Sequence, residues 1–310
     1  MKLKKFEGNP ILSPIEEHDW EAKMVFNPAV YYNDGVHIVY RAMDREGISR
    51  FGYAFSKGGY NIDERLDHPI FVPEDNFECH GVEDPRITKI GDTLYMVYAG
   101  FDGVRAHVAL ATIQEEDFLN RNWKWERHGD IFPKKLPFRG KDDKDAFIFP
   151  EKVLDNWLLV HRVPPDIWFS YSQDLNRWID HAVVVLPRPG LWDNMKIGGG
   201  GPPFKTEVGW IFIYHGVTHT PGKAFGKYQL GVIITDLKNP EEVLYRSDEP
   251  ILEPTEEYEL ARDASGPDVV FTCGQIVHDE KVLVYYGGGD TSIGVADAEI
   301  SDFIPKRMRK

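Results

Sequence analysis

A strongly apolar run of five residues recurs five times along the chain. Each run follows a polar or glycine-containing turn, and another segment rich in β-forming residues precedes each turn. The interval between successive runs is 53 to 72 residues, which indicates an internal repeat. The apolar runs are residues 36–40, 94–98, 157–161, 210–214 and 282–286.

Each copy of the repeat predicts three consecutive antiparallel strands and a less regular fourth. The apolar run is the second of these strands in every copy. The first strands are expected at residues 28–32, 85–90, 147–153, 202–205 and 269–277, and the third strands at residues 50–56, 107–113, 167–172, 228–236 and 292–298.

This organisation predicts an all-β protein, a five-bladed β-propeller that forms a single domain over residues 1–310. Helical periodicity is nearly absent. A two-sheet sandwich is the architectural alternative, but five near-equal units fit radial repetition better.

Composition narrows the classes of partner. The chain has 36 basic and 50 acidic residues, a net charge of −14, which argues against nucleic acid or an anionic membrane as the main partner.

The first residues are polar, and no stretch approaches the roughly 18 apolar residues of a membrane span, so a cytoplasmic protein is expected. Two cysteines and no ligand-spaced cluster of His or carboxylates indicate no metal site. A homo-oligomer is left open.

Antiparallel geometry gathers the candidate chemistry on one face. The start of strand 1, the end of strand 2 and the start of strand 3 all lie at the same end of a blade. Polar residues collect at these three places. They are Asn27, Asp84, Lys144, Asp145 and Asp268 at strand 1 starts, Arg41, Arg162 and His215 at strand 2 exits, Asp44, Asp102, Asp166 and Asp290 in the turns beyond, and Tyr228 at a strand 3 start.

The stretch of residues 81–86 places two carboxylates and a guanidinium ahead of an apolar strand. Acids are uncommon in strands and are seldom buried without a partner. Asp84 therefore forms either a structural ion pair with Arg86 or part of a proton-transfer site, and the motif alone favours the ion pair.

The other acids have a structural interpretation, since Asp commonly caps turns by bonding its own backbone. Asp290 differs because it follows three glycines, residues 287–289. Lys196 has a similar setting before the glycines of residues 198–201. The missing side chains either admit a ligand close to the backbone or belong to close-packed turns, and the sequence leaves both open.

Charge is distributed unevenly around the predicted ring. The first and second copies place Asn27, Arg41, Asp84 and Arg86 at the shared face. The third and fourth copies place a set of cationic or hydrogen-bond donor groups there, which are Lys144, Lys152, Arg162, Lys196, His215 and Tyr228. Such groups, if they converge near the axis, would form an oxyanion site, and phosphate is the obvious dianion. The alternative is a set of solvated charges that never converge. Lys152 is the weakest member because Glu151 could pair with it.

Several blocks of the sequence resemble the signature blocks of glycoside hydrolase family 130. The similarity extends from Asn27 to Ala296 in the order of the family. The blocks are residues 83–86 (Glu-Asp-Pro-Arg), 144–152, 159–162, 192–198, 210–217 and 285–291.

The resemblance implies a five-bladed propeller that acts on β-mannosides, in most members by reversible phosphorolysis to α-mannose 1-phosphate. Asp84 would be the general acid, acting through the mannose 3-hydroxyl. Phosphate ligands would be Lys144, Arg162, His215 and Tyr228, and sugar contacts would be Asn27, Arg41, Arg86 and Asp290. The small molecules would be an oligosaccharide and inorganic phosphate as co-substrate, with no cofactor.

A single acid suits this chemistry. An inverting hydrolase needs a second carboxylate to activate water, whereas phosphate is already an anionic nucleophile that must be oriented and neutralised. We expect a raised pKa for Asp84, through burial and the neighbouring Glu83.

Three other functions remain open. They are a hydrolase of the same family, a furanosidase-like five-bladed hydrolase using Asp44, Asp166 or Asp290 as further carboxylates, and a non-catalytic sugar-binding propeller. Pro28 replaces a small polar residue of many relatives in the resembled family, and the loop of residues 219–227 is longer than in some of them, which leaves the acceptor sugar open. The linkage, β-1,2 or β-1,4, is set together with the acceptor by outer loops such as residues 44–50 and 101–107, whose shapes the sequence does not give.

Overall fold

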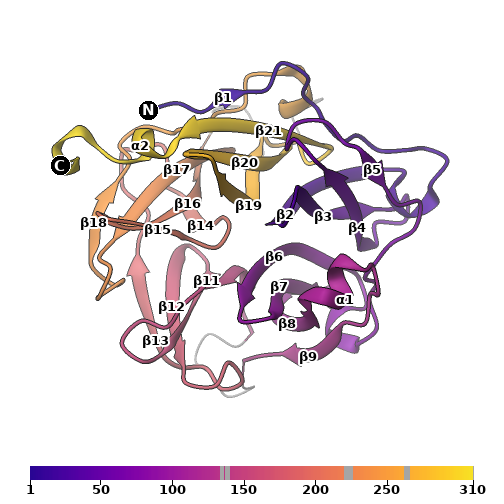
Figure 1. Cartoon of the computed structure of the whole chain (residues 1–310), viewed down its shortest axis with the longest axis horizontal. Helices are drawn as coiled ribbons and strands as arrows, with labels where there is room; N and C mark the ends of the chain where they lie inside the picture. Colours follow the sequence, from indigo (N-terminus) through magenta and orange to yellow (C-terminus); the bar gives the residue numbers. More distant parts are fainter. Residues whose placement is uncertain (133–135, 137–139, 220–225, 262–265, 310) are drawn as a thin grey trace.

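Five antiparallel sheets surround one axis in the computed structural model, which describes residues 1–132, 136, 140–219, 226–261 and 266–309 (Figure 1). The five-bladed propeller is confirmed. The first blade contains β2 (Met24–Tyr32), β3 (Val36–Met43), β4 (Ser49–Ser56) and β5 (Glu64–Arg65), and the second contains β6 (Val82–Ile90), β7 (Thr93–Phe101), β8 (Ala106–Gln114) and β9 (Glu126–Asp130). The third blade contains β10 (Lys144–Ile148), β11 (Trp157–Val163), β12 (Asp166–Ser172) and β13 (Ile179–Val185), and the fourth contains β14 (Lys196–Gly199), β15 (Phe204–Thr206), β16 (Gly209–Thr218), β17 (Lys227–Thr235) and β18 (Val243–Arg246). The fifth blade contains β19 (Val270–His278), β20 (Lys281–Gly288), β21 (Ser292–Glu299) and β1 (Lys4–Lys5).

Two predicted first strands differ from the structure. In the third blade the strand expected at residues 147–153 lies at 144–148, because Pro150 lacks the N–H that would continue the ladder. In the fourth blade the strand expected at residues 202–205 is split into β14 and β15, which pair with opposite ends of β16. Residues 200–203, Gly-Gly-Pro-Pro, interrupt the ladder between them.

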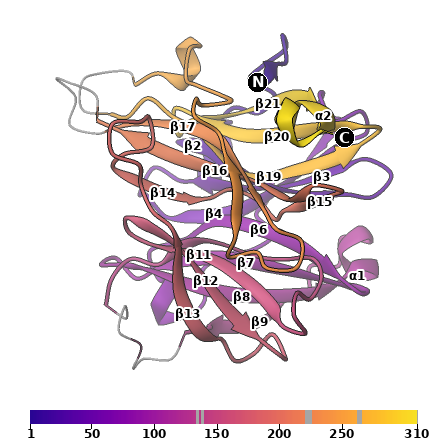
Figure 2. The same ribbon diagram turned by 90° about the vertical axis from the view of Figure 1, so that its left-hand side faces the viewer.

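The N-terminus closes the ring. Strand β1 pairs with β21, with Lys4 opposite Asp297 and Lys5 opposite Ala296. The fifth blade therefore takes its fourth strand from the beginning of the chain, which joins the two ends of the propeller. Both termini consequently lie on the same side of the molecule (Figure 2).

The core lies between neighbouring blades. Each of five apolar clusters combines side chains from two successive sheets; for example, Val39 and Phe51 of the first blade pack with Ile87 and Met96 of the second. Sheets that are covered on both faces need apolar residues at nearly every position, which explains the continuous apolar runs.

A buried ionic clamp recurs in the blades. In the second blade Glu78, which is fully buried, accepts from Tyr98 Oη at 2.8 Å and pairs with Arg127 at 2.6 Å. Asp143 and His161 take the corresponding places in the third blade, with His161 Nδ1 2.9 Å from Asp143 Oδ1. The related sets are Glu21–Tyr40–Arg65, Asp193–Tyr214–Arg246 and Glu259–Tyr286–Lys5.

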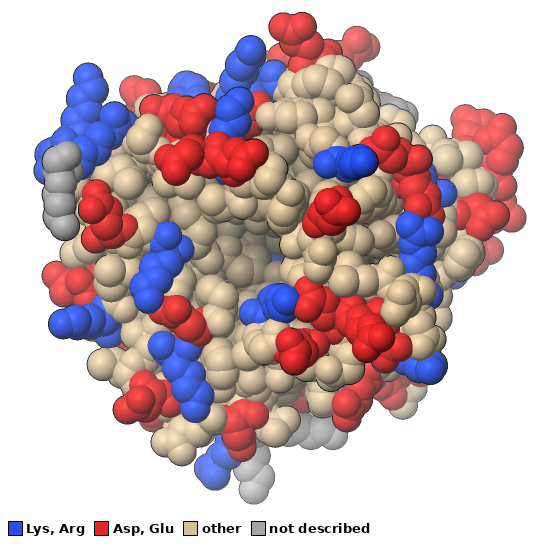
Figure 3. Space-filling view, in the orientation of Figure 1, with Lys and Arg blue, Asp and Glu red and all other residues tan. Residues whose placement is uncertain are grey.

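Helices are short and lie outside the sheets. They are α1 (Glu115–Leu119), α2 (Ile300–Phe303) and the 3₁₀ turns Asp19–Glu21, Asn76–Glu78, Glu257–Glu259 and Lys306–Met308. Over the face that carries α1 and α2, acidic and basic side chains are interspersed around a central hollow (Figure 3). Within the described ranges, the helices are all too short or too polar to cross a bilayer.

Candidate active site

The first strands of three blades share a β-bulge near the axis. Pairing shifts register after Phe26, after Glu83 and after Lys144. Inside the bulges stand Asn27, Asp84 and Asp145, with φ of 47°, 51° and 57°. Asn and Asp tolerate this left-handed backbone better than other residues with a side chain, and a bulge redirects the side chain it contains.

Asp84 is enclosed at the junction of the first two blades. It is 2% exposed, and its Oδ1 atom accepts from Asn27 Nδ2 at 2.8 Å and from Arg41 at 3.2 Å. Glu83 beside it pairs with Arg41 at 2.6 Å and lies 3.8 Å from Lys144 Nζ. The structure therefore brings together Asn27, Arg41, Asp84 and Lys144, as the sequence predicted.

The expected rise in the pKa of Asp84 is wrong. Burial raises the pKa of Asp84, but the charges of Arg41, Lys144 and Arg86 outweigh burial and hold its pKa below the usual value of 3.8. Glu83 is engaged by two of these cations rather than acting as a bare neighbouring charge. Burial and the neighbouring Glu83 would raise the pKa of Asp84, but Arg41 and Lys144 are brought beside it from other blades by folding.

Arg86 is tied to the protein rather than open to a ligand. It is 1% exposed, and its three nitrogens donate to the carbonyl oxygens of Asp84, Gly199 and Gly200 and to the Asp145 carboxylate. Its contacts therefore do not support a direct sugar contact. They hold the Asp84 bulge against the fourth blade. The ion pair between Asp84 and Arg86 that the motif alone favoured is wrong, because Arg86 pairs with Asp145 and reaches only the backbone carbonyl of Asp84, while the Asp84 carboxylate pairs with Arg41.

A second cluster forms where the third and fourth blades meet. Asp145, fully buried, pairs with Arg162 at 2.8 Å, and Arg162 lies 3.4 Å from His215 Nε2. The Tyr228 ring lies 5.9 Å from the His215 ring, and Lys196 Nζ lies 5.1 Å from the centre of the Tyr228 ring. The predicted convergence of cationic and donor groups is confirmed for these side chains.

Burial and the surrounding cations decide the protonation of this cluster. Burial lowers the pKa of His215 to about 3; Asp145 opposes this shift, while Arg162 and Lys196 add to it. The ring is therefore neutral near pH 7. Although burial raises the pKa of Asp145, the charge of Arg162 and the neighbouring His215 and Arg86 hold it well below the usual range.

Two buried donors in this cluster have no hydrogen-bond partner among the described residues. They are Arg162 Nε and His215 Nδ1. The Oδ1 atom of Asn27 is a buried acceptor that also has no hydrogen-bond partner among the described residues. Buried polar atoms normally find partners, so each of these atoms has unused capacity for a ligand.

Other predicted residues lie elsewhere. Lys152 is exposed and donates to the Gln173 carbonyl, while Glu151 pairs with Lys205 rather than with Lys152. Asp44 caps its turn by accepting from two backbone amides, and Asp102 does the same. Of the loop of residues 219–227, residues 220–225 lie outside the described part of the chain.

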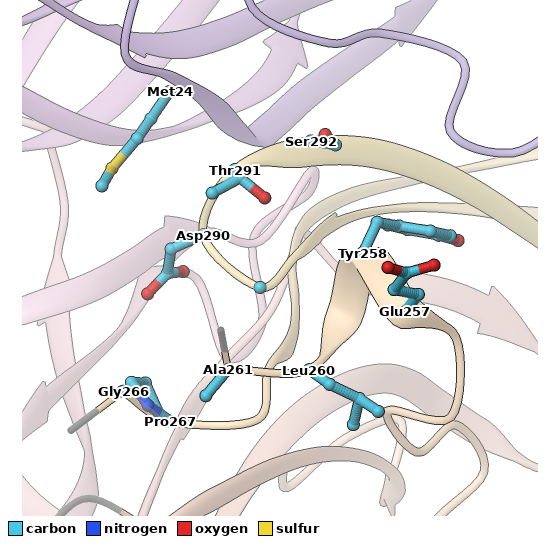
Figure 4. Close-up of a pocket in the computed structure, with 11 residues that line it drawn as sticks. Met24, Glu257, Tyr258, Leu260, Ala261, Gly266, Pro267, Asp290, Thr291 and Ser292 are labelled. Carbon is cyan, nitrogen blue, oxygen red and sulfur yellow. The ribbon is translucent and has the colours of Figure 1, made fainter. Parts of the chain in front are cut away.

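Asp290 borders a cavity of about 600 Å³ next to the axis (Figure 4). Burial raises the pKa of Asp290 to about 6, with Arg41 opposing and Asp84 adding to this shift. Its neighbours in the cavity wall include Met24, Tyr258, Leu260 and Pro267.

The glycines beside this site serve close packing. A Cβ on Gly287 would lie 2.5 Å from Asn27 Oδ1, and one on Gly198 would lie 2.4 Å from both Asp145 Oδ2 and His215 Cε1. Of the two alternatives that the sequence left open, these contacts support close-packed turns. No group of three or more His, Cys, Asp or Glu side chains in the described ranges is arranged to hold a metal ion.

Comparison with known proteins shows the family of this chain. The model of glycoside hydrolase family 130, described as β-1,4-mannooligosaccharide phosphorylase, matches residues 2–306. A 1,2-β-oligomannan phosphorylase of Thermoanaerobacter sp. (strain X514) is 40% identical, over 97% of this chain and 99% of its own. A β-1,2-mannobiose phosphorylase of the same organism is also 40% identical, over 96% of this chain and 97% of its own.

A solved structure of a similar protein has the same fold. The β-1,2-mannobiose phosphorylase from Listeria innocua, in complex with β-1,2-mannobiose, superimposes with a TM-score of 0.82 at 28% identity, covering 98% of both chains.

Proposed function

The chain belongs to glycoside hydrolase family 130, and on this premise we propose that it catalyses the inverting phosphorolysis of β-mannosides to α-mannose 1-phosphate. Its named relatives at 40% identity are phosphorylases of β-1,2-linked mannosides, so we assign β-1,2-manno-oligosaccharides as the substrate class. The enzyme would need inorganic phosphate as co-substrate and no other cofactor.

The observation that carries this proposal is the pair of unpartnered donors, Arg162 Nε and His215 Nδ1, in a cluster that also contains Tyr228 and Lys196. A phosphate that reaches these nitrogens would accept a hydrogen bond from each of them. Lys144, whose backbone pairs with that of Arg162, would supply a further charge. Orientation and neutralisation of the nucleophile are the tasks that phosphorolysis requires of the protein.

Asp84 would donate the proton to the leaving oxygen. In the free enzyme the cations around Asp84 favour its ionised form. A phosphate dianion bound beside Lys144 and Arg162 would offset part of that positive charge, and the entering sugar would exclude water. Both changes raise the pKa of Asp84, so the acid would become protonated as the substrates assemble.

Asn27 and Arg41 would orient Asp84 and the mannose together. Each donates to Asp84 Oδ1, and Asn27 retains an unpartnered Oδ1 atom for a sugar hydroxyl. Asp290, in the wall of the adjoining cavity, would bind another hydroxyl of the substrate. We assign Arg86 to holding the Asp84 bulge.

The test is incubation with β-1,2-mannobiose and β-1,4-mannobiose, each with and without inorganic phosphate. Phosphate-dependent release of mannose 1-phosphate from the β-1,2 substrate supports the proposal. Release of free mannose without phosphate would indicate a hydrolase, and binding without turnover would indicate a sugar-binding propeller. Equal or better turnover of the β-1,4 substrate would overturn the linkage assignment alone.

A further inference from the structure

Asp145 occupies the same position in the third blade that Asp84 occupies in the second. Both are bulge residues with left-handed backbone, one blade apart, and both are almost completely buried. Their surroundings differ. Asp84 accepts from an amide and a guanidinium on one oxygen. Asp145 accepts from Arg86 on Oδ1 and forms an ion pair with Arg162 through Oδ2, which has no hydrogen-bond partner among the described residues.

Three blades converge on the Asp145 carboxylate. Arg86 of the second blade reaches Oδ1 at 3.3 Å, Arg162 of the third reaches Oδ2 at 2.8 Å, and His215 Nε2 of the fourth lies 3.6 Å from Oδ2. A carboxylate enclosed in this way stays ionised, so Asp145 cannot serve as a proton donor despite its equivalence to Asp84.

These contacts decide which nitrogens remain available. Asp145 forms an ion pair with the Nη1 atom of Arg162, and the same Nη1 atom lies 3.4 Å from His215 Nε2. Arginine only donates, so Nε2 of the neutral imidazole is the acceptor and its proton resides on Nδ1. The unpartnered Arg162 Nε and His215 Nδ1 are then both N–H donors.

We propose that Asp145 is a positioning residue of the phosphate site: it holds Arg162, whose Nη1 atom in turn donates to His215 Nε2, so that Arg162 Nε–H and His215 Nδ1–H are presented to the anion. This inference rests on the proposed function, since it takes phosphate as the anion. Asp145 itself does not touch the substrate; it acts through the two side chains that it orients.

Positioning and simple charge make opposite predictions. A carboxylate close to an anion site repels the anion, so if Asp145 acted only through its charge, removing that charge would tighten phosphate binding. If Asp145 acts by positioning, its removal releases Arg162 and His215 and weakens phosphate binding. The sign of the change distinguishes the two.

The experiment compares Asp145→Asn with Gly198→Ala. The second variant keeps every charge but places a methyl group against Asp145 Oδ2 and His215 Cε1. Glu21→Gln is the matched control, because Glu21 is also a fully buried carboxylate paired with an arginine, Arg65, but belongs to the clamp inside the first blade.

Initial rates of mannose 1-phosphate formation are measured against phosphate at saturating mannoside, and against mannoside at saturating phosphate. We expect the KM for phosphate to rise about tenfold or more in Asp145→Asn and Gly198→Ala, and the KM for mannoside to change less than about threefold. Glu21→Gln should leave both constants near the wild-type values while lowering the melting temperature.

Calorimetric titration of each variant with inorganic phosphate alone should give the same ranking without turnover. An unchanged or lower KM for phosphate and an unchanged or tighter Kd in folded Asp145→Asn would overturn the positioning role. A wild-type enzyme that releases mannose without phosphate would instead refute the proposed function, so the two failures are distinguishable.

Discussion

Asn27 donates its side-chain amide to Asp84 Oδ1 over 2.8 Å, which links the bulge of the first blade to that of the second. Both residues have a left-handed backbone conformation, and they are 57 residues apart in the sequence. The orientation of the proposed acid therefore depends on the packing of two blades rather than on its own strand. Predictions about catalysis follow from this arrangement of neighbouring blades.

Asp84→Asn should remove the acid and preserve the shape of the site. We expect the rate of mannose 1-phosphate formation to fall by roughly 10²- to 10⁴-fold, because an amide cannot supply the proton. Phosphorolysis rates, together with circular dichroism to verify folding, test this. A folded variant with full activity would exclude Asp84 as the acid.

Arg162→Gln should weaken phosphate binding by removing both a charge and the free Nε–H donor. We expect the KM for phosphate to rise by about tenfold or more. Lys152→Gln is the control, since Lys152 belongs to the same blade but is exposed and bonded to the Gln173 carbonyl. Equal effects of the two substitutions would show that the cluster contributes only a general positive field.

Asp290→Asn should alter how stability depends on pH. The pKa of Asp290 is about 6 in the folded protein against an ordinary value of 3.8, so between about pH 4 and pH 6 the folded state retains a proton that the unfolded state has lost. The contribution of Asp290 to stability is thus complete at low pH and disappears as pH rises through 6.

Asparagine does not ionise, so Asp290→Asn does not lose this stability as pH rises. Its free energy of unfolding, relative to wild type, should increase as pH rises from 4 to 7, as measured by urea unfolding at several pH values. The exposed Asp92→Asn serves as the control. A constant difference between Asp290→Asn and wild type over this range would contradict the raised pKa.

Glu78→Ala should destabilise the fold through the ionic clamp. Removing a fully buried carboxylate leaves Arg127 and Tyr98 without their partner, and we expect a loss of about 3 kcal/mol or more in the free energy of unfolding. Glu74 also pairs with Arg127, at 3.2 Å, but its side chain is 61% exposed. Chemical denaturation of Glu74→Ala should therefore show a loss below about 1 kcal/mol.

The repeat of apolar runs was sufficient to predict the fold. Runs such as residues 210–214 are buried between sheets on both sides, and that burial leaves a local pattern in the sequence. The prediction was less accurate where no apolar pattern exists. Strand β14 contains Lys196 and two glycines, and β1 is only two residues long at the other end of the chain.

The site was predicted in its residue types but not in its electrostatics. Asp84, Arg162 and His215 follow from strand ends and from family resemblance. Asp145 was noticed only as a polar residue at a strand start, although its equivalence to Asp84 within the repeat was a usable signal. The tight contact of Gly198 with Asp145 and His215 has no counterpart in local sequence.

The sequence by itself determined the propeller and the face on which polar groups gather, because apolar runs and turn residues are patterns of a few residues. The family was indicated by the resemblance of the signature blocks. Only the tertiary structure decided which groups pair and which remain free. Burial and Coulomb interactions also act between residues distant in the chain: Arg41 and Lys144 come from two other blades to join Arg86 in lowering the pKa of Asp84, and Asp145 joins Arg86, Arg162 and His215 from three blades. The pKa values and ion pairs that result depend on distances in space, which no local pattern encodes.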